Sequence, residues 1–209
     1  MSGLKIAVIF FIAILNGMKT VYGIWNYKEN TEPFWKVWNC RWLYAASAVS
    51  LAAGSLLFIL GKEGFYLLKY ADLLYTYILL AVVDQKTKKV PDTVLLVFLA
   101  AQLLMAGAGN ISGFMEGILG SLIFSVIIIL VSVTSGGKMG LGDAKLLAVT
   151  AIMAGWSYTL VILCIAMALS LVYGIWLMLF RHLSSKEEMP FVPFLCLGVM
   201  IHLVYFLRS

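Results

Sequence analysis

The chain has 209 residues, of which 63% are hydrophobic and 12% are charged, and its formal net charge is +5. Soluble domains contain about 25% charged residues, so the composition excludes an ordinary soluble domain and predicts an all-α membrane protein. The positive charge does not by itself indicate nucleic-acid binding, because lysines and arginines gather in the cytoplasmic loops of membrane proteins. We therefore expect a lipid bilayer, and no nucleic acid, as a partner of this chain.

Eight apolar stretches approach the length of about 20 residues that a helix needs to cross the hydrocarbon. They cover residues 6–25, 42–60, 65–83, 93–108, 114–134, 144–155, 157–180 and 191–207. The sixth would form only about 18 Å of helix, so either it begins inside the preceding turn or that turn lies below the membrane surface. The first has no clear small-residue cleavage site and is interpreted as an uncleaved span. The sequence predicts one domain, residues 1–209, built as a polytopic bundle of about eight transmembrane helices.

The lysines and arginines of the connecting loops predict the side of the membrane that each loop faces. Ten fall in one set of loops and three in the other. The larger set contains Lys28, Lys36, Arg41, Lys86, Lys88, Lys89, Lys138, Lys145, Arg181 and Lys186. Because positive residues are in excess on the cytoplasmic side, this set is predicted to be cytoplasmic and both termini to lie outside.

Cysteine and histidine residues give no sign of a metal site. Cys40, Cys164 and Cys196 lie far apart with no Cys-x-x-Cys pair, and His182 and His202 fall at opposite ends of the last spans. This pattern favours neither a zinc site nor a disulfide framework, so no metal and no cofactor are expected.

The segment 138–145, Lys-Met-Gly-Leu-Gly-Asp-Ala-Lys, separates two apolar stretches and places Asp143 at the membrane boundary. An ionisable group at such a depth is by default a functional candidate, usually with a partner. Gly140 and Gly142 can adopt backbone conformations closed to other residues and allow another segment to approach closely. The alternative interpretation is that Asp143 merely caps the next helix, where free amides favour a carboxylate.

Asp84 ends the third apolar stretch, on the same predicted side of the membrane as Asp143. An aspartic protease needs two such carboxylates: they share one proton, the ionised member takes a proton from water, and the protonated member polarises the scissile carbonyl. The alternative for Asp84 is an ordinary helix-end carboxylate solvated among lysines. Asp92 follows Pro91 and is better explained as a cap of the fourth helix, so it ranks below Asp84 as a catalytic candidate.

Three segments together resemble the type IV prepilin peptidases, which are membrane aspartic proteases of the Gly-x-Gly-Asp class. They are Asp84 with the Lys-Val-Pro-Asp run at 89–92, the Gly-Leu-Gly-Asp-Ala-Lys-Leu-Leu-Ala run at 140–148, and the Pro-Phe-Val-Pro-Phe run at 190–194. By composition alone, the last run predicts only a stiff chain before a helix. All three in the family's order, within 84–194, are a more specific signal than any one of them.

The resemblance implies that Asp84 and Asp143 form the catalytic pair and that Gly140 and Gly142 shape the loop presenting Asp143. It also implies a structural or electrostatic role for Lys145. The remaining site candidates, as a wall of the active site or a substrate contact, are Pro190, Phe191, Pro193 and Phe194.

The family's substrates are prepilin-like precursors: pilins, pseudopilins or archaeal flagellins with a short basic leader, a glycine before the cleaved bond and an apolar helix. The resemblance therefore implies a multi-pass endopeptidase of the cytoplasmic (inner) cell membrane with its active site on the cytoplasmic side. The substrate's apolar helix would lie in the membrane beside the enzyme while its leader stays in the cytoplasm.

Two features depart from the family pattern. Val192 stands where the family usually has glycine, a change that affects the backbone there or the substrate groove. Many bacterial members also carry, between the first two spans, an insert with two Cys-x-x-Cys pairs that is associated with N-methylation of the cleaved pilin. Here that loop, residues 26–41, contains only Cys40. The sequence therefore favours a minimal, peptidase-only member.

Two other functions remain open. Presenilin-like and signal-peptide-peptidase-like proteases pair Gly-x-Gly-Asp with Tyr-Asp and Pro-Ala-Leu motifs, but here Val83 precedes Asp84 and no Pro-Ala-Leu occurs. A non-enzymatic transporter or assembly factor would use the two acids for protons or cations, although transporters tend to hold such acids near the membrane midplane and to have repeated halves. Separately, Lys69 and Asp72, three residues apart in the third span, are expected to neutralise each other.

Overall fold

The computed structural model describes residues 2–27, 61–108, 111–135, 139–181 and 189–208, and the regular structure in these ranges is α-helical. The seven helices of this part of the chain are α1 (Ser2–Tyr27), α4 (Gly61–Thr87), α5 (Asp92–Ala108), α6 (Ile111–Thr134), α7 (Leu141–Ala154), α8 (Trp156–Arg181) and α9 (Val192–Arg208). Each corresponds to one predicted apolar stretch, with ends that differ by a few residues. The predicted stretch 42–60 lies outside the described residues.

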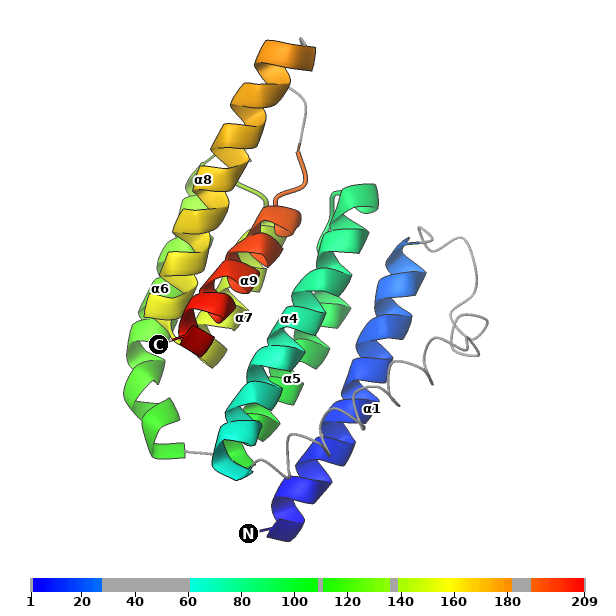
Figure 1. Ribbon diagram of the computed structural model, residues 1–209, viewed down its shortest axis with the longest axis vertical. Helices are drawn as coiled ribbons and strands as arrows, with labels where there is room; N and C mark the ends of the chain where they lie inside the picture. The colour runs from blue at the N-terminus through cyan, green and yellow to red at the C-terminus, as the bar shows by residue number, and fades with distance from the viewer. Residues whose placement is uncertain (1, 28–60, 109–110, 136–138, 182–188, 209) are drawn as a thin grey trace.

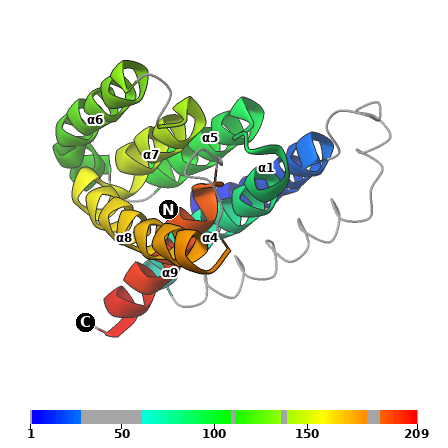
Figure 2. The same ribbon diagram turned by 90° about the horizontal axis from the view of Figure 1, so that it is seen from above.

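The helices lie side by side in two rows. Seen from above, α6, α7, α5 and α1 form one row, and α8, α9 and α4 form the other (Figure 2). The packing agrees with this order, because α7 packs on α6 and α5, α1 on α5, and α9 on α8 and α4. The ends of α1, α4, α6 and α8 and the starts of α5, α7 and α9 lie at the same end of the bundle (Figure 1). The three segments singled out in the sequence therefore gather at that end.

The two boundaries of α7 determine how this helix joins its neighbours at either end of the bundle. α7 begins at Leu141, so its 14 residues, about 21 Å of helix, include the Gly-Asp sequence. Of the two options for the short sixth stretch, the first is therefore confirmed. α7 ends at Ala154 and is followed by Gly155, whose φ of 98° lies in the left-handed region that favours glycine, and α8 starts at Trp156.

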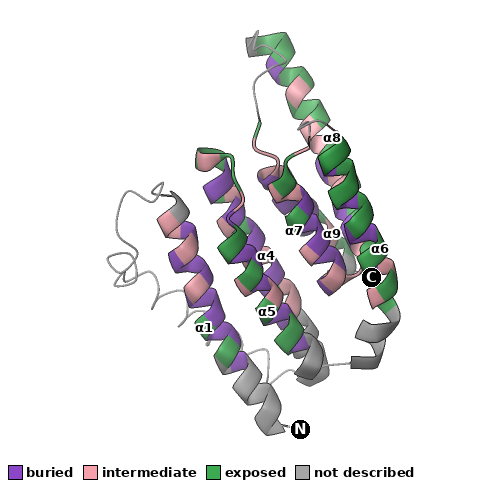
Figure 3. Cartoon of the chain, turned by 180° about the vertical axis from the view of Figure 1, so that it is seen from behind, coloured by how far each residue is buried: buried purple, intermediate pink, exposed green. Residues whose placement is uncertain are grey.

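Large apolar side chains cover the outer faces of α6 and α8. Figure 3 shows exposed residues along both helices. Only 22% of Gly117–Thr134 and 11% of Trp156–Phe180 are buried. Within the described residues, these two helices are long and apolar enough to cross a membrane, and α5 and α9 contain shorter apolar helices. Such an apolar exterior is unusual for a soluble monomer and typical of helices that face lipid.

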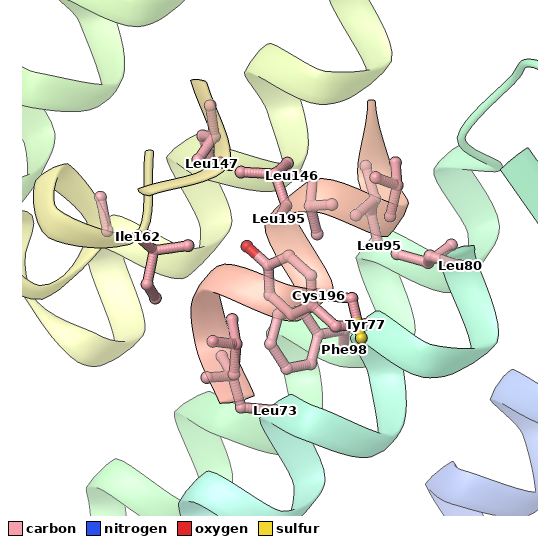
Figure 4. Packing of buried hydrophobic residues seen from close by; sticks show 14 of the residues in the cluster. Leu73, Tyr77, Leu80, Leu95, Phe98, Leu146, Leu147, Ile162, Leu195 and Cys196 are labelled. Atoms are coloured by element: carbon pink, nitrogen blue, oxygen red, sulfur yellow. The ribbon is translucent and has the colours of Figure 1, made fainter. Parts of the chain in front are cut away.

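The interior of the bundle consists of closely packed side chains from six helices, α4 to α9, some of which Figure 4 shows. Tyr77 of α4 and Phe98 of α5 lie at its centre, with Leu147 of α7, Ile162 of α8 and Leu195 of α9 around them, and all five are almost completely buried. Because lipid tails are as apolar as leucine, close packing holds helices together in a membrane more than removal from water does.

A buried polar cluster joins α1 to α4 and α5. The ammonium group of Lys19 donates hydrogen bonds to Asp72 Oδ1 at 2.7 Å and to Thr76 Oγ1 at 3.0 Å. The amide of Gln102 donates to Asp72 Oδ2 at 2.9 Å. The predicted pair of Lys69 with Asp72 is therefore wrong, since both oxygens of the Asp72 carboxylate bind residues of other helices. Three-residue spacing on one helix could not reveal a partner on α1.

Candidate active site

Asp84 lies near the end of α4 and faces the start of α9. Its Oδ2 accepts a hydrogen bond from the backbone N–H of Val192 at 3.1 Å. Val192 is the first residue of α9, and the first N–H groups of a helix have no partner within it. Asp84 therefore supplies, from another helix, the negative acceptor that a helix start favours. With only 4% of its surface exposed, it is not the solvated helix-end carboxylate of the alternative interpretation.

Asp143 lies in the first turn of α7, and its side chain is half-buried. The residue at the cap position is Gly140, whose backbone is extended with φ −61° and ψ 132°, and no side chain forms a capping hydrogen bond there. The interpretation of Asp143 as the helix cap is therefore wrong. Asp143 instead lies within the first turn of α7, at the positive end of the helix dipole.

Gly140 and Gly142 make close contacts possible. A Cβ atom at Gly140 would lie 3.0 Å from Oδ2 of Asp143, and one at Gly142 would lie 2.9 Å from Cβ of Val90. Val90 belongs to the turn between α4 and α5, so Gly142 lets this turn pack directly on the first turn of α7. The close approach of another segment that was expected at both glycines is seen at Gly142, whereas the neighbour of Gly140 is Asp143 of the same turn. Unusual backbone angles are not seen at either position, because Gly155 is the one described glycine with a positive φ.

An ion pair connects the start of α5 to the start of α7. The Nζ atom of Lys145 donates to both carboxylate oxygens of Asp92, at 2.8 and 2.9 Å, and both side chains are largely exposed. This pair gives Lys145 a structural contact. The ion pair also distinguishes the two candidate acids of the α4–α5 segment. Asp92 is exposed and bound to a lysine, whereas Asp84 is buried beside α9.

Residues 190–194 lie directly beside Asp84. Phe191 and Phe194 are half-buried and pack against the core of the bundle. Pro190 precedes α9, and Pro193 lies in the first turn of α9, where a missing N–H removes no helical hydrogen bond. Val192, fully buried between them, carries the contact to Asp84. The segment thus contacts Asp84 through the backbone of Val192.

The two acids interact electrostatically, and both lie just outside the apolar stretches 65–83 and 144–155. Burial and, secondarily, the negative charge of Asp84 raise the pKa of Asp143 to about 7. Burial also raises the pKa of Asp84, while backbone hydrogen bonds from Val192 and Phe191 oppose that rise. These hydrogen bonds stabilise the ionised form of Asp84, whereas Asp143 retains its proton to near-neutral pH.

The described site offers acid–base groups. Within the described ranges, no group of three or more His, Cys, Asp or Glu side chains is arranged to hold a metal ion. What the site brings together is two interacting carboxyl groups from α4 and α7, with the start of α9 at one of them. Such a pair can remove a proton from water and donate a proton to a carbonyl oxygen.

Sequence reasoning missed two contacts made by the helices that carry the acids. The Val192 N–H is a backbone donor, so no residue type signals it, and Val192 stood out only as a departure from glycine. The second is a hydrogen bond between the hydroxyls of Tyr77 and Thr150, at 2.9 Å. Each of these residues lies seven positions from one of the acids, a spacing that is readable in the sequence once both acids have been identified.

Comparison with known proteins gives a consistent family. Residues 72–175, about half of the chain, match the model of the type IV leader peptidase family. Proteins named prepilin leader peptidase/N-methyltransferase, from Aeromonas salmonicida and Aeromonas hydrophila, are each 28% identical to the chain over 142 residues. These alignments cover 65% of this chain and 49% of each relative, so the chain spans about half the length of the curated relatives it matches. No solved structure matches it significantly.

Proposed function

The chain belongs to the type IV leader peptidase family, and we propose that it is a membrane aspartic endopeptidase with Asp84 and Asp143 as its catalytic pair. The observation that carries this proposal is the meeting of the two acids at one end of the bundle, where the charge of Asp84 acts on Asp143. Two carboxyls that affect each other's charge do not both ionise easily, and one ionised with one protonated carboxyl is the state an aspartic protease uses.

In the proposed reaction, Asp84 starts ionised and Asp143 starts protonated. Asp84 takes a proton from water, the water oxygen attacks the scissile carbonyl carbon, and the proton of Asp143 passes to the carbonyl oxygen. In the second step, Asp84 gives its proton to the leaving nitrogen while Asp143 takes one from a hydroxyl of the intermediate. The carbon–nitrogen bond breaks, the water oxygen stays in the new carboxyl group, and both acids return to their starting states.

The surroundings of the two acids support this division of roles. The N–H of Val192 donates to Asp84 and favours its ionised form. Burial and the charge of Asp84 raise the pKa of Asp143 to about 7, which favours its protonated form far more than the ordinary pKa of an aspartic acid would. Acid–base groups work best when their pKa values lie near the working pH.

We propose prepilin-like precursors as substrates, cleaved after a glycine that ends a short basic leader. The support is the family and the printed name of the relatives. We do not propose methyltransferase activity for this chain, because residues 26–41 contain one cysteine rather than two Cys-x-x-Cys pairs. The exposed apolar faces of α6 and α8 support a multi-pass membrane location. The lysine-bearing segments beside the acids support a site on the cytoplasmic face.

Cleavage of a prepilin-like substrate by the membrane-embedded or detergent-solubilised protein tests the proposal. Asp84→Asn and Asp143→Asn should each lower the rate by about 10²–10⁴-fold, the contribution typical of acid–base groups. Asp92→Asn removes a carboxylate from the same segment and serves as the matched control, with cleavage retained within a few-fold.

Other outcomes would change the assignment. Loss of cleavage in Asp92→Asn but not in Asp84→Asn would keep the enzyme and replace one catalytic residue. If the folded wild-type protein cleaves none of several pilin-like substrates, the non-enzymatic transporter or assembly role takes precedence.

A further inference from the structure

Two buried hydroxyl groups connect the helices that carry the acids. Tyr77 of α4 and Thr150 of α7 are both fully buried, and their hydroxyl oxygens are 2.9 Å apart. The hydroxyl of Thr150 also donates to the backbone oxygen of Leu146 at 2.8 Å. Because a threonine hydroxyl has one proton, Thr150 accepts in the first bond and Tyr77 is the donor. The two hydrogen bonds thus connect the Tyr77 side chain of α4, through the Thr150 hydroxyl, to the backbone of α7.

The position of this bond follows that of the acids. Tyr77 lies seven residues before Asp84, and Thr150 lies seven residues after Asp143. Seven residues make about two helical turns, or roughly 10 Å, so each hydroxyl residue is on the same face of its helix as the acid. Since α4 ends where α7 begins (Figure 1), both offsets run in the same direction along the bundle. The hydrogen bond therefore lies two turns inward from the acid pair.

We propose that the Tyr77–Thr150 hydrogen bond sets the register of α4 against α7 and thereby the separation of Asp84 and Asp143. Both hydroxyl residues are then positioning residues of the site. Figure 4 shows the Tyr77 ring crossing the core with its hydroxyl on the side of Leu146 and Leu147 of α7. A slip of one helix past the other would leave the buried hydroxyl of Tyr77 without its acceptor, a loss that opposes the slip.

The remaining packing explains why one hydrogen bond has this influence. α7 packs mainly on α6, α8 and α5, whereas α4 packs mainly on α9 and α1. The two helices that carry the acids are thus held chiefly by different neighbours. Nearer the acids, α7 meets the turn that follows α4 through Gly142 and Val90. The hydroxyl bond supplies the second fixed point, and two points determine a register.

A distance measurement tests the positioning directly and needs no substrate. Spin labels would be placed on cysteines at Gln85 and Leu141, two exposed positions beside the acids, after replacing Cys40, Cys164 and Cys196 by alanine. Tyr77→Phe should broaden or shift the distribution of distances between the labels. Tyr75→Phe is the matched control, because the Tyr75 hydroxyl on the same helix bonds Thr20 of α1 instead. It should leave the distribution unchanged.

The outcomes of this measurement are decisive. An unchanged distribution in Tyr77→Phe, or equal broadening in both tyrosine variants, would overturn the proposed positioning. The result holds even if the protein cleaves no prepilin, so a failure of the proposed peptidase function remains distinguishable from a failure of this inference.

Kinetics provide the second test, and this part rests on the proposed function. Tyr77→Phe should lower kcat by about tenfold with KM changed less than about twofold, because displaced acids affect the chemical step rather than substrate binding. Thr150→Val should lower kcat more than Tyr77→Phe does, since it leaves the Tyr77 hydroxyl buried without its acceptor. The double variant should recover part of that loss.

A matched threonine completes the kinetic series. Thr159 is equally buried and donates to the backbone oxygen of Gly155 at 3.0 Å, at the start of α8. Thr159→Val should leave kcat within about twofold of the wild type. A loss in Tyr77→Phe confined to KM, or additive losses in the double variant, would contradict the positioning role.

Discussion

At the residue scale, the two acids of the proposed pair are one residue type in two environments. Asp84 is buried and accepts a backbone N–H at the start of α9. Asp143 is half-buried in the first turn of α7 and close enough to Asp84 to be affected by its charge. The neighbours, rather than the residue type, thus make the two carboxyl groups differ in how readily each one ionises.

We expect kcat/KM to fall as the pH rises through about 7, the value to which burial and the charge of Asp84 raise the pKa of Asp143. Asp143 acts in its protonated form in the proposed reaction, so each pH unit above that pKa should reduce the rate by about tenfold. The rate should also fall in acid, where Asp84 becomes protonated. Initial rates at constant ionic strength between about pH 4 and 9 would measure both limbs. A flat profile up to the alkaline end would contradict the assigned role of Asp143.

Gly142→Ala should impair the enzyme through a steric contact. The added Cβ would lie 2.9 Å from Cβ of Val90, and neither atom is the end of a flexible side chain. Overpacking of this kind typically costs about 1–3 kcal/mol, and displacement of the turn beside Asp143 should lower kcat/KM by about tenfold or more. Thermal unfolding and initial rates would measure the two effects.

Gly117→Ala provides the control for that substitution. Gly117 lies in α6, and a Cβ there would have no atom within 4 Å. Stability and activity should match the wild type. If Gly142→Ala behaved like Gly117→Ala, the contact between the α4–α5 turn and α7 would not be needed for the site.

At the element scale, the site forms where the ends of several helices meet. α4 contributes Asp84, α7 contributes Asp143, α9 contributes a backbone donor, and α5 is connected to α7 through Asp92 and Lys145. The turn between α4 and α5 is short, and Lys88 within it has a positive φ of 51°. The same turn carries Val90, which packs against Gly142, so the end of α4 lies close to the start of α7.

Breaking the Asp92–Lys145 ion pair should have a modest effect. Both side chains are largely exposed, and such pairs contribute about 0–1 kcal/mol. We expect Asp92→Asn and Lys145→Gln to lower cleavage by no more than a few-fold, and the charge-reversed double variant Asp92→Lys with Lys145→Asp to recover part of the loss. Parallel rate measurements with Asp84→Asn provide the scale. Loss as complete as in Asp84→Asn would show that Lys145 or Asp92 takes part in the chemistry.

The sequence predicted the helices better than it predicted the contacts between them. Long apolar stretches and the Gly-x-Gly-Asp turn are local sequence signals, so α7 could be predicted, with an earlier start as one of two options. The Lys19–Asp72 pair and the Val192 N–H could not be predicted, because residue spacing along one helix does not show which helices pack together. The stretch 42–60 and the placement of both termini outside stay predictions.

At the scale of the whole molecule, the buried cluster around Asp72 connects α1 to the helix that carries Asp84. The side chains of Lys19 and Asp72 are 0% and 1% exposed. Lys19→Met should destabilise the protein by about 3–5 kcal/mol, because it leaves a buried carboxylate without its cation. Lys19→Met with Asp72→Leu should recover most of that loss. Thermal unfolding in detergent would measure both variants.

The same variants distinguish stability from catalysis. Asp72 is about three helical turns from Asp84 along α4, and Lys19 binds Asp72 from α1, so kcat of the folded fraction should stay within about twofold of the wild type. A Lys19→Met protein as stable as the wild type would mean that the cluster does not hold α1 in place.

The Lys19–Asp72 pair also has a consequence for the order of synthesis. Lys19 precedes Asp72 by 53 residues, so it leaves the ribosome well before the carboxylate that neutralises it. Insertion of a lone lysine at membrane depth costs about 2.5–3.5 kcal/mol. If α1 and α4 cross the bilayer as proposed, this cost is avoided when α1 stays at the insertion machinery until α4 has been made. The two helices would then enter the lipid together, already neutralised.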